Sequence, residues 1–124
     1  MKQGFVKVAS ATPRIRVADP VYNAQVICEQ AKEAAEHGAK IVVFPELCIT
    51  GYTCNDLFLQ ELLLEKAKEA LLTIAEETGQ LETLFLVGLP VDKDGRLYNV
   101  AAVLYRGRIL GMIPKKNIPM YAEF

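Results

Sequence analysis

The sequence has few of the residues that build disulfide frameworks or metal sites. Its 124 residues include one histidine and three cysteines, an odd number without framework spacing. This cysteine usage favours a reduced, cytoplasmic chain over a secreted one. No pair or trio of histidine, cysteine and carboxylate has the spacing of a zinc site, so we expect no metal in this chain.

Excess charge, long apolar runs and phosphate-binding glycine motifs are also missing. The formal net charge of −1 offers no electrostatic basis for binding nucleic acid. Apolar runs such as residues 41–44 are far too short to span a bilayer, and the first residues do not resemble a signal peptide. Without a glycine-rich dinucleotide fingerprint or a phosphate loop, any ATP or dinucleotide chemistry must lie in a region outside this chain.

The sequence does contain enough apolar residues, 52% of the chain, for one folded domain with a core. Hydrophobic periodicity predicts an α/β layered fold with a mixed sheet and two helices, in the order βαβαβββ. The predicted strands cover residues 5–12, 41–44, 83–89, 97–105 and 108–113. The predicted helices run from Pro20 to a stop at His37-Gly38, and from about residue 57 to residue 78. Asp92–Gly95 is predicted to be a turn, and the last two strands should form a hairpin across Arg106-Gly107.

Each predicted helix has an apolar stripe that should face the sheet. Val21, Ile27 and Cys28 belong to the first stripe, and Leu62 and Leu71 belong to the second. Cys28 is therefore expected to be a buried, inert thiol.

Two charged side chains at predicted strand ends are candidates for catalysis. Ile41–Phe44 is an apolar run typical of a strand buried on both faces, and Pro45 should end its pairing. Glu46 follows at the carboxyl end of that strand, where ligands bind in open α/β sheets. Lys115 lies just past the fifth predicted strand. A base and a cation suit amide hydrolysis through a thiol, because one removes the thiol proton and the other stabilises the oxyanion.

Two motifs resemble those of the nitrilase (carbon–nitrogen hydrolase) superfamily. Residues 43–47 read Val-Phe-Pro-Glu-Leu and residues 50–52 read Thr-Gly-Tyr, which is similar to the first catalytic motif of that family. Pro-Lys at 114–115, followed by Ile-Pro-x-Tyr-x-Glu-Phe at 118–124, is similar to its lysine motif. The Gly-Tyr and Asn-Asp-Leu segment at 51–57 and the second motif resemble, more narrowly, the amidase domain of glutamine-dependent NAD synthetases.

The resemblance implies the leading part of an α-β-β-α sandwich, with Glu46 as the general base and Lys115 stabilising the tetrahedral intermediate. Tyr52, Tyr121 and Phe124 resemble the family's substrate-pocket aromatics, although they could instead pack the loops against the sheet.

The family's nucleophilic cysteine lies on a later strand, and no cysteine of this chain takes its place. Cys48 and Cys54 belong to the loop after the base, and the second predicted strand separates His37 from Cys48. Residues 1–124 are therefore predicted to be a partial amidase domain that is inactive alone. For the parent protein the resemblance implies glutamine as substrate, ammonia delivered to NAD synthesis, homo-oligomers, and ATP and magnesium used by a missing carboxy-terminal synthetase region. No cofactor is expected in this chain.

Two alternatives remain open from the sequence. One is a free-standing nitrilase-like amidase that acts on another small amide or nitrile. The other is a non-catalytic interaction module. If the domain is cut, the partial sheet with its exposed edges and apolar surface is expected to self-associate unless a partner chain covers it.

Overall fold

The computed structural model describes residues 7–16, 19–45, 48–50 and 57–118. Its elements follow the predicted βαβαβββ order. They are β1 (Val8–Ser10), α1 (Pro20–Glu36), β2 (Ile41–Val43), α2 (Leu57–Glu77), β3 (Leu84–Lys93), β4 (Arg96–Tyr105) and β5 (Arg108–Ile118). Among the described helices, none is long and apolar enough to cross a membrane.

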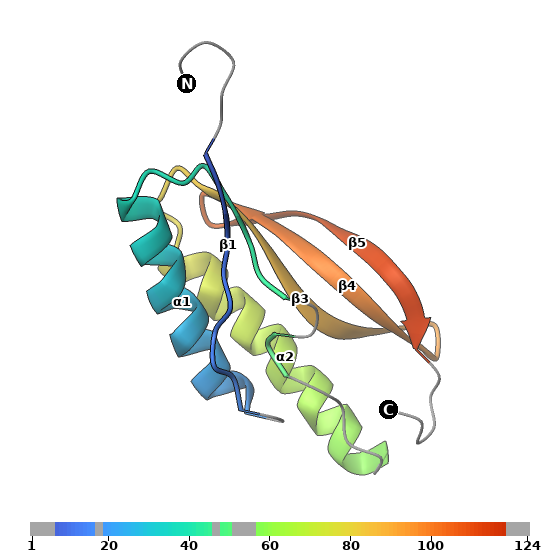
Figure 1. Cartoon of the computed structure of the whole chain (residues 1–124). Coiled ribbons are helices and arrows are strands. Elements are labelled where there is room, and N and C mark those ends of the chain that lie inside the picture. Colours follow the sequence, from blue (N-terminus) through green and yellow to red (C-terminus); the bar gives the residue numbers. More distant parts are fainter. Residues whose placement is uncertain (1–6, 17–18, 46–47, 51–56, 119–124) are drawn as a thin grey trace.

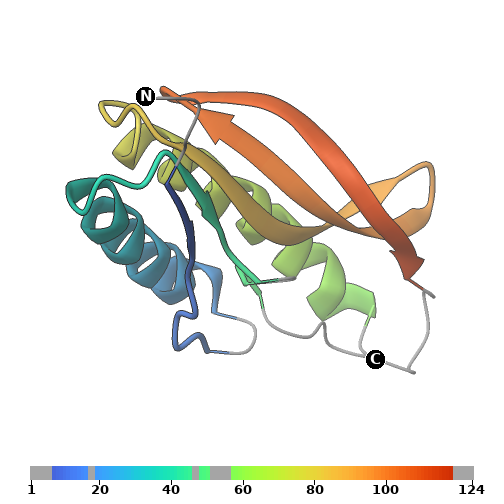
Figure 2. The same cartoon turned by 45° about the horizontal axis from the view of Figure 1, so that its top comes forward.

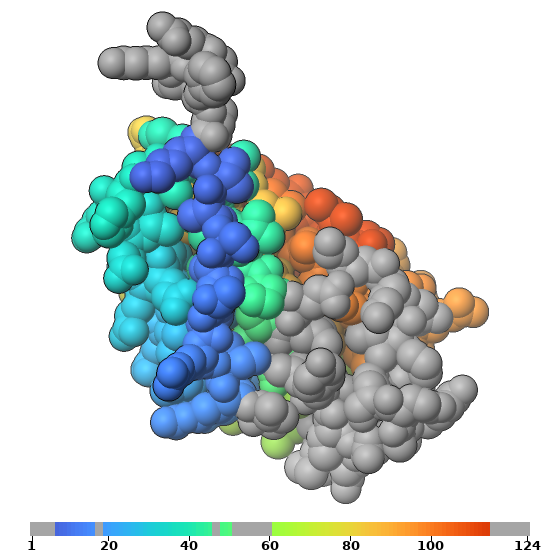
Figure 3. All heavy atoms as spheres, in the orientation of Figure 1, coloured from blue at the N-terminus to red at the C-terminus, as the bar shows by residue number. Residues whose placement is uncertain are grey.

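The strands form one mixed sheet, as predicted, and their order within it is β1-β2-β3-β4-β5. β1, β2 and β3 pair in parallel, whereas the β3–β4 and β4–β5 pairs are antiparallel hairpins. Both helices cover one face of this sheet, and the other face carries no helix of the described chain (Figures 1 and 2). β1 runs along the surface beside β2 (Figure 3). The described chain is therefore a two-layer α/β unit.

The core lies between the helices and the sheet. Its fully buried members include Ile27, Ile74, Val42 and Phe85. Within the predicted helix stripes, Cys28 and Leu71 are buried as expected, but Val21 is 63% exposed and Leu62 is 48% exposed. Those two predictions were wrong because each apolar stripe is wider than the surface that the sheet and the neighbouring helix cover.

The last three strands are longer at their ends than the sequence predicts. β3 continues through Pro90 to Lys93, so the turn is only Asp94-Gly95 rather than Asp92–Gly95. Both turn residues have positive φ, 53° and 76°, which is the backbone that tight two-residue hairpins require. β5 continues to Ile118, so Lys115 lies inside the strand and not past its end. The predicted end at residue 113 was wrong, because the strand continues through Pro114, and proline is tolerated in an edge strand.

β1 is shorter than predicted, spanning Val8–Ser10 instead of residues 5–12. Residues 5 and 6 lie outside the described part. Ala11 still donates its N–H to the Val43 carbonyl at 3.0 Å, so the chain stays beside β2 for one more residue.

Candidate active site

The chain that leaves β2 docks onto β3 through the carbonyl of Gly88. Phe44 first donates its N–H to the Leu86 carbonyl at 2.9 Å. After Pro45, which has no N–H, Ile49 donates its N–H to the Gly88 carbonyl at 3.2 Å, and the Cys48 thiol lies 3.6 Å from the same oxygen. Cys48 and Ile49 are fully buried. Phe44 and Ile49 are therefore each bonded to the backbone of β3.

A buried asparagine of α1 secures this turn from the helical layer. Asn23 donates from Nδ2 to the Ile49 carbonyl at 2.7 Å. The same side chain bonds both backbone groups of Arg16, accepting from its N–H at 2.6 Å and donating to its carbonyl at 2.7 Å. Asn23 thus ties the segment after β1, helix α1 and the turn after β2 to one another.

A small hollow of about 190 Å³ opens where β2 ends. Pro45 lines it from the end of β2, Leu86 and Gly88 line it from β3, and Asn99 and Ala101 line it from β4. The Oδ1 atom of the buried Asn99 has no hydrogen-bond partner within the described part of the chain. A polar atom is therefore buried beside the residue that precedes Glu46.

Lys115 lies at a β-bulge on the strand next to Asn99. Asn99 pairs with Lys116 and Val100 pairs with Pro114, so Lys115 is an extra residue in β5. Bulges are frequent next to active sites, where they redirect a side chain. The pairing therefore places the backbone of Lys115 beside Asn99, which lines the hollow.

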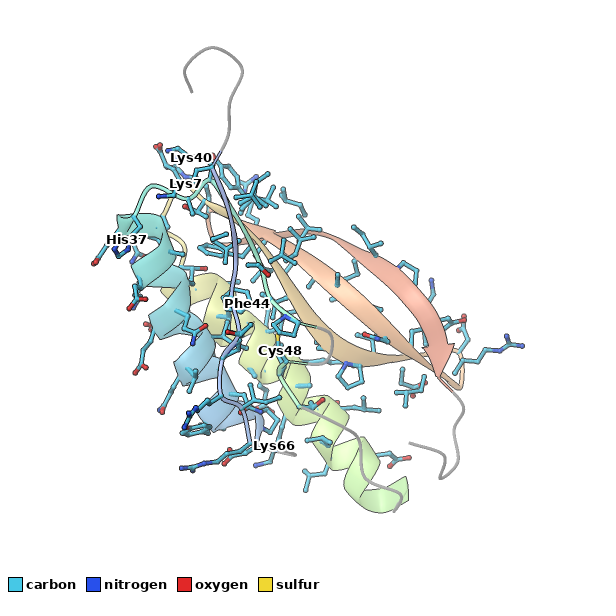
Figure 4. All side chains as sticks on the ribbon, viewed as in Figure 1. Lys7, His37, Lys40, Phe44, Cys48 and Lys66 are labelled. Atoms are coloured by element: carbon cyan, nitrogen blue, oxygen red, sulfur yellow. The ribbon has the colours of Figure 1, made fainter. Side chains whose placement is uncertain are left out.

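Neither described thiol has the character of a nucleophile. Burial raises the pKa of Cys48 to about 11, against smaller lowerings by backbone hydrogen bonds of Gly88 and Cys48. Burial, with help from the Glu77 carboxylate, raises the pKa of Cys28 to about 11 as well. Both groups are therefore neutral at pH 7, as expected for inert core thiols. His37 lies at the far end of β2 from Cys48 (Figure 4), which agrees with the absence of a Cys–His dyad in the sequence.

A larger hollow lies elsewhere, and its lining includes more charged side chains than the hollow at the end of β2. A groove of about 490 Å³ between α1 and α2 is lined by Val21, Cys28 and the Lys32–Glu77 ion pair, whose charged atoms are 3.3 Å apart. Among the described residues, no group of three histidine, cysteine or acidic side chains could hold a metal ion. The hollow at the end of β2 is the candidate for chemistry because Pro45, the residue before Glu46, lines it.

Four of the five predicted site residues lie outside the described residues: Glu46, Tyr52, Tyr121 and Phe124. The fifth, Lys115, is described in its backbone only. Cys54 is outside as well.

Two residues of the site were missed from sequence, Asn23 and Asn99. The available signal was a polar residue within an apolar pattern, since Asn23 is one helical turn before the buried Ile27, and Asn99 interrupts the apolar run of β4.

Comparisons with known proteins agree with this architecture. The carbon-nitrogen hydrolase family matches residues 7–122. A glutamine-dependent NAD(+) synthetase from Mycobacterium tuberculosis is 39% identical over 123 residues, which is 99% of this chain but 18% of that protein. The chain thus spans about a fifth of the curated relatives it matches.

Solved structures show the same fold. A glutamine-dependent NAD(+) synthetase from Cytophaga hutchinsonii has a TM-score of 0.80 at 31% identity, over 90% of this chain and 19% of that one. An amidase from Nesterenkonia sp. has a TM-score of 0.74 at 24% identity, over 93% of this chain and 44% of that one, which shows the fold alone. Because the family match covers nearly the whole chain, the chain belongs to the carbon-nitrogen hydrolase family.

Proposed function

We propose that this chain is the leading part of the glutamine-hydrolysing domain of a glutamine-dependent NAD synthetase. The observation that carries the proposal is the convergence of the two sequence motifs. The hollow beside Pro45 is also lined by Asn99, whose partner strand carries the bulge at Lys115. We propose that the base that follows Pro45 and the cation at the bulge act on one substrate.

In the proposed reaction, Glu46 takes the proton of a cysteine thiol, and the thiolate attacks the side-chain carbonyl of glutamine. The Lys115 ammonium stabilises the oxyanion of the tetrahedral intermediate. Glu46 returns the proton to the leaving nitrogen, ammonia departs, and water hydrolyses the glutamyl thioester. Tyr52, Tyr121 and Phe124 are proposed to line the glutamine pocket.

The nucleophilic thiol is proposed to come from a later part of a longer polypeptide. The relatives are about five times longer than the matched region, and both described thiols are buried with raised pKa values. The ATP- and magnesium-dependent synthetase region would also lie there and receive the ammonia. The helix-free face of the sheet offers a surface for the second sheet of an α-β-β-α sandwich. We further propose that the longer protein is cytoplasmic and homo-oligomeric.

The test compares glutamine-driven and ammonia-driven NAD formation in the longer protein. Glu46→Ala and Lys115→Ala are expected to lower glutamine use by about 100-fold or more, because each removes a group that acts in the transition state. Ammonia-driven synthesis should remain. Lys116→Ala is the matched control, since it removes the neighbouring charge on the same strand and should leave both activities unchanged.

Two results would overturn the proposal. If Glu46→Ala or Lys115→Ala keeps full glutamine use, the assigned roles are wrong. If the wild-type protein ignores glutamine but hydrolyses another small amide, the free-standing amidase alternative replaces the synthetase. The chain of 124 residues alone is expected to release no ammonia from glutamine.

A further inference from the structure

Asn23 places a polar amide where an apolar side chain would be expected. It belongs to the first part of α1 and is fully buried, next to Ala24 and one turn before Ile27 of the core. Burying an amide is costly unless it is hydrogen-bonded, and Asn23 uses both its donor nitrogen and its acceptor oxygen. An apolar residue would fill this position at lower cost. The position therefore calls for a role of the amide beyond packing.

The contact of Asn23 that lies nearest to the proposed catalytic residues is the one with Ile49. The Ile49 N–H donates to the Gly88 carbonyl of β3 at 3.2 Å, and the Ile49 carbonyl accepts from Asn23 Nδ2 at 2.7 Å. Both backbone polar groups of Ile49 are thus bonded, one to the sheet and one to the helical layer. Ile49 comes three residues after Glu46 in the sequence. Any displacement of Ile49 therefore acts on the proposed base through a short stretch of chain.

The contacts of Asn23 with Arg16 can be separated from its contact with Ile49. The Arg16 carbonyl accepts from the Asp19 N–H at 3.3 Å as well as from Asn23 Nδ2, so it keeps a donor when Asn23 is replaced. The Arg16 N–H needs only an acceptor, which an aspartate would also supply. An ionised aspartate has no hydrogen to donate to the Ile49 carbonyl. Asn23→Asp therefore removes mainly the Ile49 contact at nearly unchanged volume.

We propose that Asn23 is a positioning residue of the glutaminase site, which acts by holding the Ile49 carbonyl and thereby orienting the chain that carries Glu46. This inference rests on the proposed function and adds a residue to it. A general base works only within hydrogen-bond reach of the proton it removes. A misplacement of about 1 Å, caused far from the reacting atoms, can lower a rate about 100-fold. Helix α1 thus supports the base through a single buried amide.

The test uses the longer enzyme with three single substitutions. Asn23→Asp and Asn23→Ala both remove the donor to Ile49, the first with an added charge and the second without one. Asp19→Ala is the matched control, because Asp19 caps the same end of α1 by accepting from the Tyr22 N–H at 3.2 Å and makes no bond to Ile49. The measurements are kcat and KM for glutamine, ammonia-driven NAD formation, and the folded fraction at several temperatures.

Both Asn23 variants are expected to lower kcat for glutamine by about 10- to 100-fold per folded enzyme, because the base is misplaced. KM should change less than kcat, and ammonia-driven synthesis should stay within about twofold, since the effect acts on the transition state of glutamine hydrolysis. Asp19→Ala should lower thermal stability but keep kcat for glutamine.

A double-mutant cycle with Glu46→Ala separates positioning from general damage. If Asn23 acts through Glu46, adding Asn23→Asp to Glu46→Ala should lower the residual kcat by less than about twofold, because residues that act as a unit are not additive. A purely structural effect would lower kcat by the same factor with and without Glu46.

Full kcat in both Asn23 variants would overturn the inference, as would an additive cycle. A loss of kcat that disappears on cooling would also overturn it, because the loss would then reflect unfolding. A raised KM at unchanged kcat would mean that the turn shapes the glutamine pocket and does not position the base. If any of these results occurs while Glu46→Ala and Lys115→Ala still abolish glutamine use, only the role of Asn23 is wrong. If those two variants keep glutamine use, the proposed function itself fails.

Discussion

Replacing Asn23 with alanine is expected to loosen the turn that follows β2. The Asn23 amide makes three hydrogen bonds, two to the backbone of Arg16 and one to the carbonyl of Ile49. The side chain is fully buried, so water cannot take its place without opening the contact between α1 and the turn. Asn23→Ala therefore separates three segments that no other described side chain joins together.

The cost follows from which backbone groups lose their partners. The Ile49 carbonyl is buried, and leaving such a group unpaired costs about 1–3 kcal/mol. The two groups of Arg16 are partly buried, and each lost bond there costs about 0.5–1.5 kcal/mol. The expected decrease in unfolding free energy is about 2–6 kcal/mol. Thr83→Val breaks a single buried bond and should cost about 1–2 kcal/mol.

Urea unfolding of the wild-type protein and both variants measures these differences, if the slope of each transition stays constant. Hydrogen exchange read by mass spectrometry adds the local effect. The N–H of Ile49 is bonded to the Gly88 carbonyl, so its protection should fall in Asn23→Ala more than that of the β3–β4 hairpin. In Thr83→Val the protection at Ile49 should be unchanged.

Two results would refute the reasoning. The first is an Asn23→Ala variant that loses no more stability than Thr83→Val. The second is an Ile49 amide that keeps its wild-type protection when Asn23 is replaced. Either result would mean that the turn is held by its contacts with β3 alone.

Three further predictions follow from other parts of the structure. Cys48 holds its proton more tightly when folded, with a pKa of about 11 against 9.0, so the stability this provides is complete below pH 9 and is lost as pH rises to 11. In urea unfolding, the difference in unfolding free energy between wild type and Cys48→Ala should decrease by up to about 3 kcal/mol over that range. A difference that stays constant with pH would contradict this. Gly38 ends α1 with φ of +87°, so Gly38→Ala should lower the unfolding free energy by about 1 kcal/mol in the same urea experiments. Gly111 has no positive φ and space around the position of an added Cβ, so Gly111→Ala should leave the unfolding free energy nearly unchanged. The 124-residue chain should self-associate on sedimentation through its helix-free face, and Val43→Lys with Val103→Lys should shift it toward monomer; a monomeric wild type would disprove this.

Local sequence patterns predicted most of the fold. Asp19 and Pro20 start α1, and Gly38 ends it, because capping and left-handed backbone are properties of a few adjacent residues. The Arg106-Gly107 hairpin turn was predicted for the same reason. The ends of β3 and β5 were not, because how far a strand extends depends on whether its neighbour continues beside it. Lys115 was expected past the strand and lies in a bulge that only the pairing with β4 creates.

The sequence by itself determined the order of elements, the family motifs and the residue types available for catalysis, since these depend on short stretches of chain. It could not determine which of these stretches meet. The approach of Pro45 to Asn99 and the clamp from Asn23 to Ile49 join residues far apart along the chain. Such contacts arise only when the sheet has been assembled in its order and the helices have packed on one face. Tertiary structure therefore decided that Pro45 and Asn99 line one hollow, and that the backbone of Lys115 lies beside Asn99.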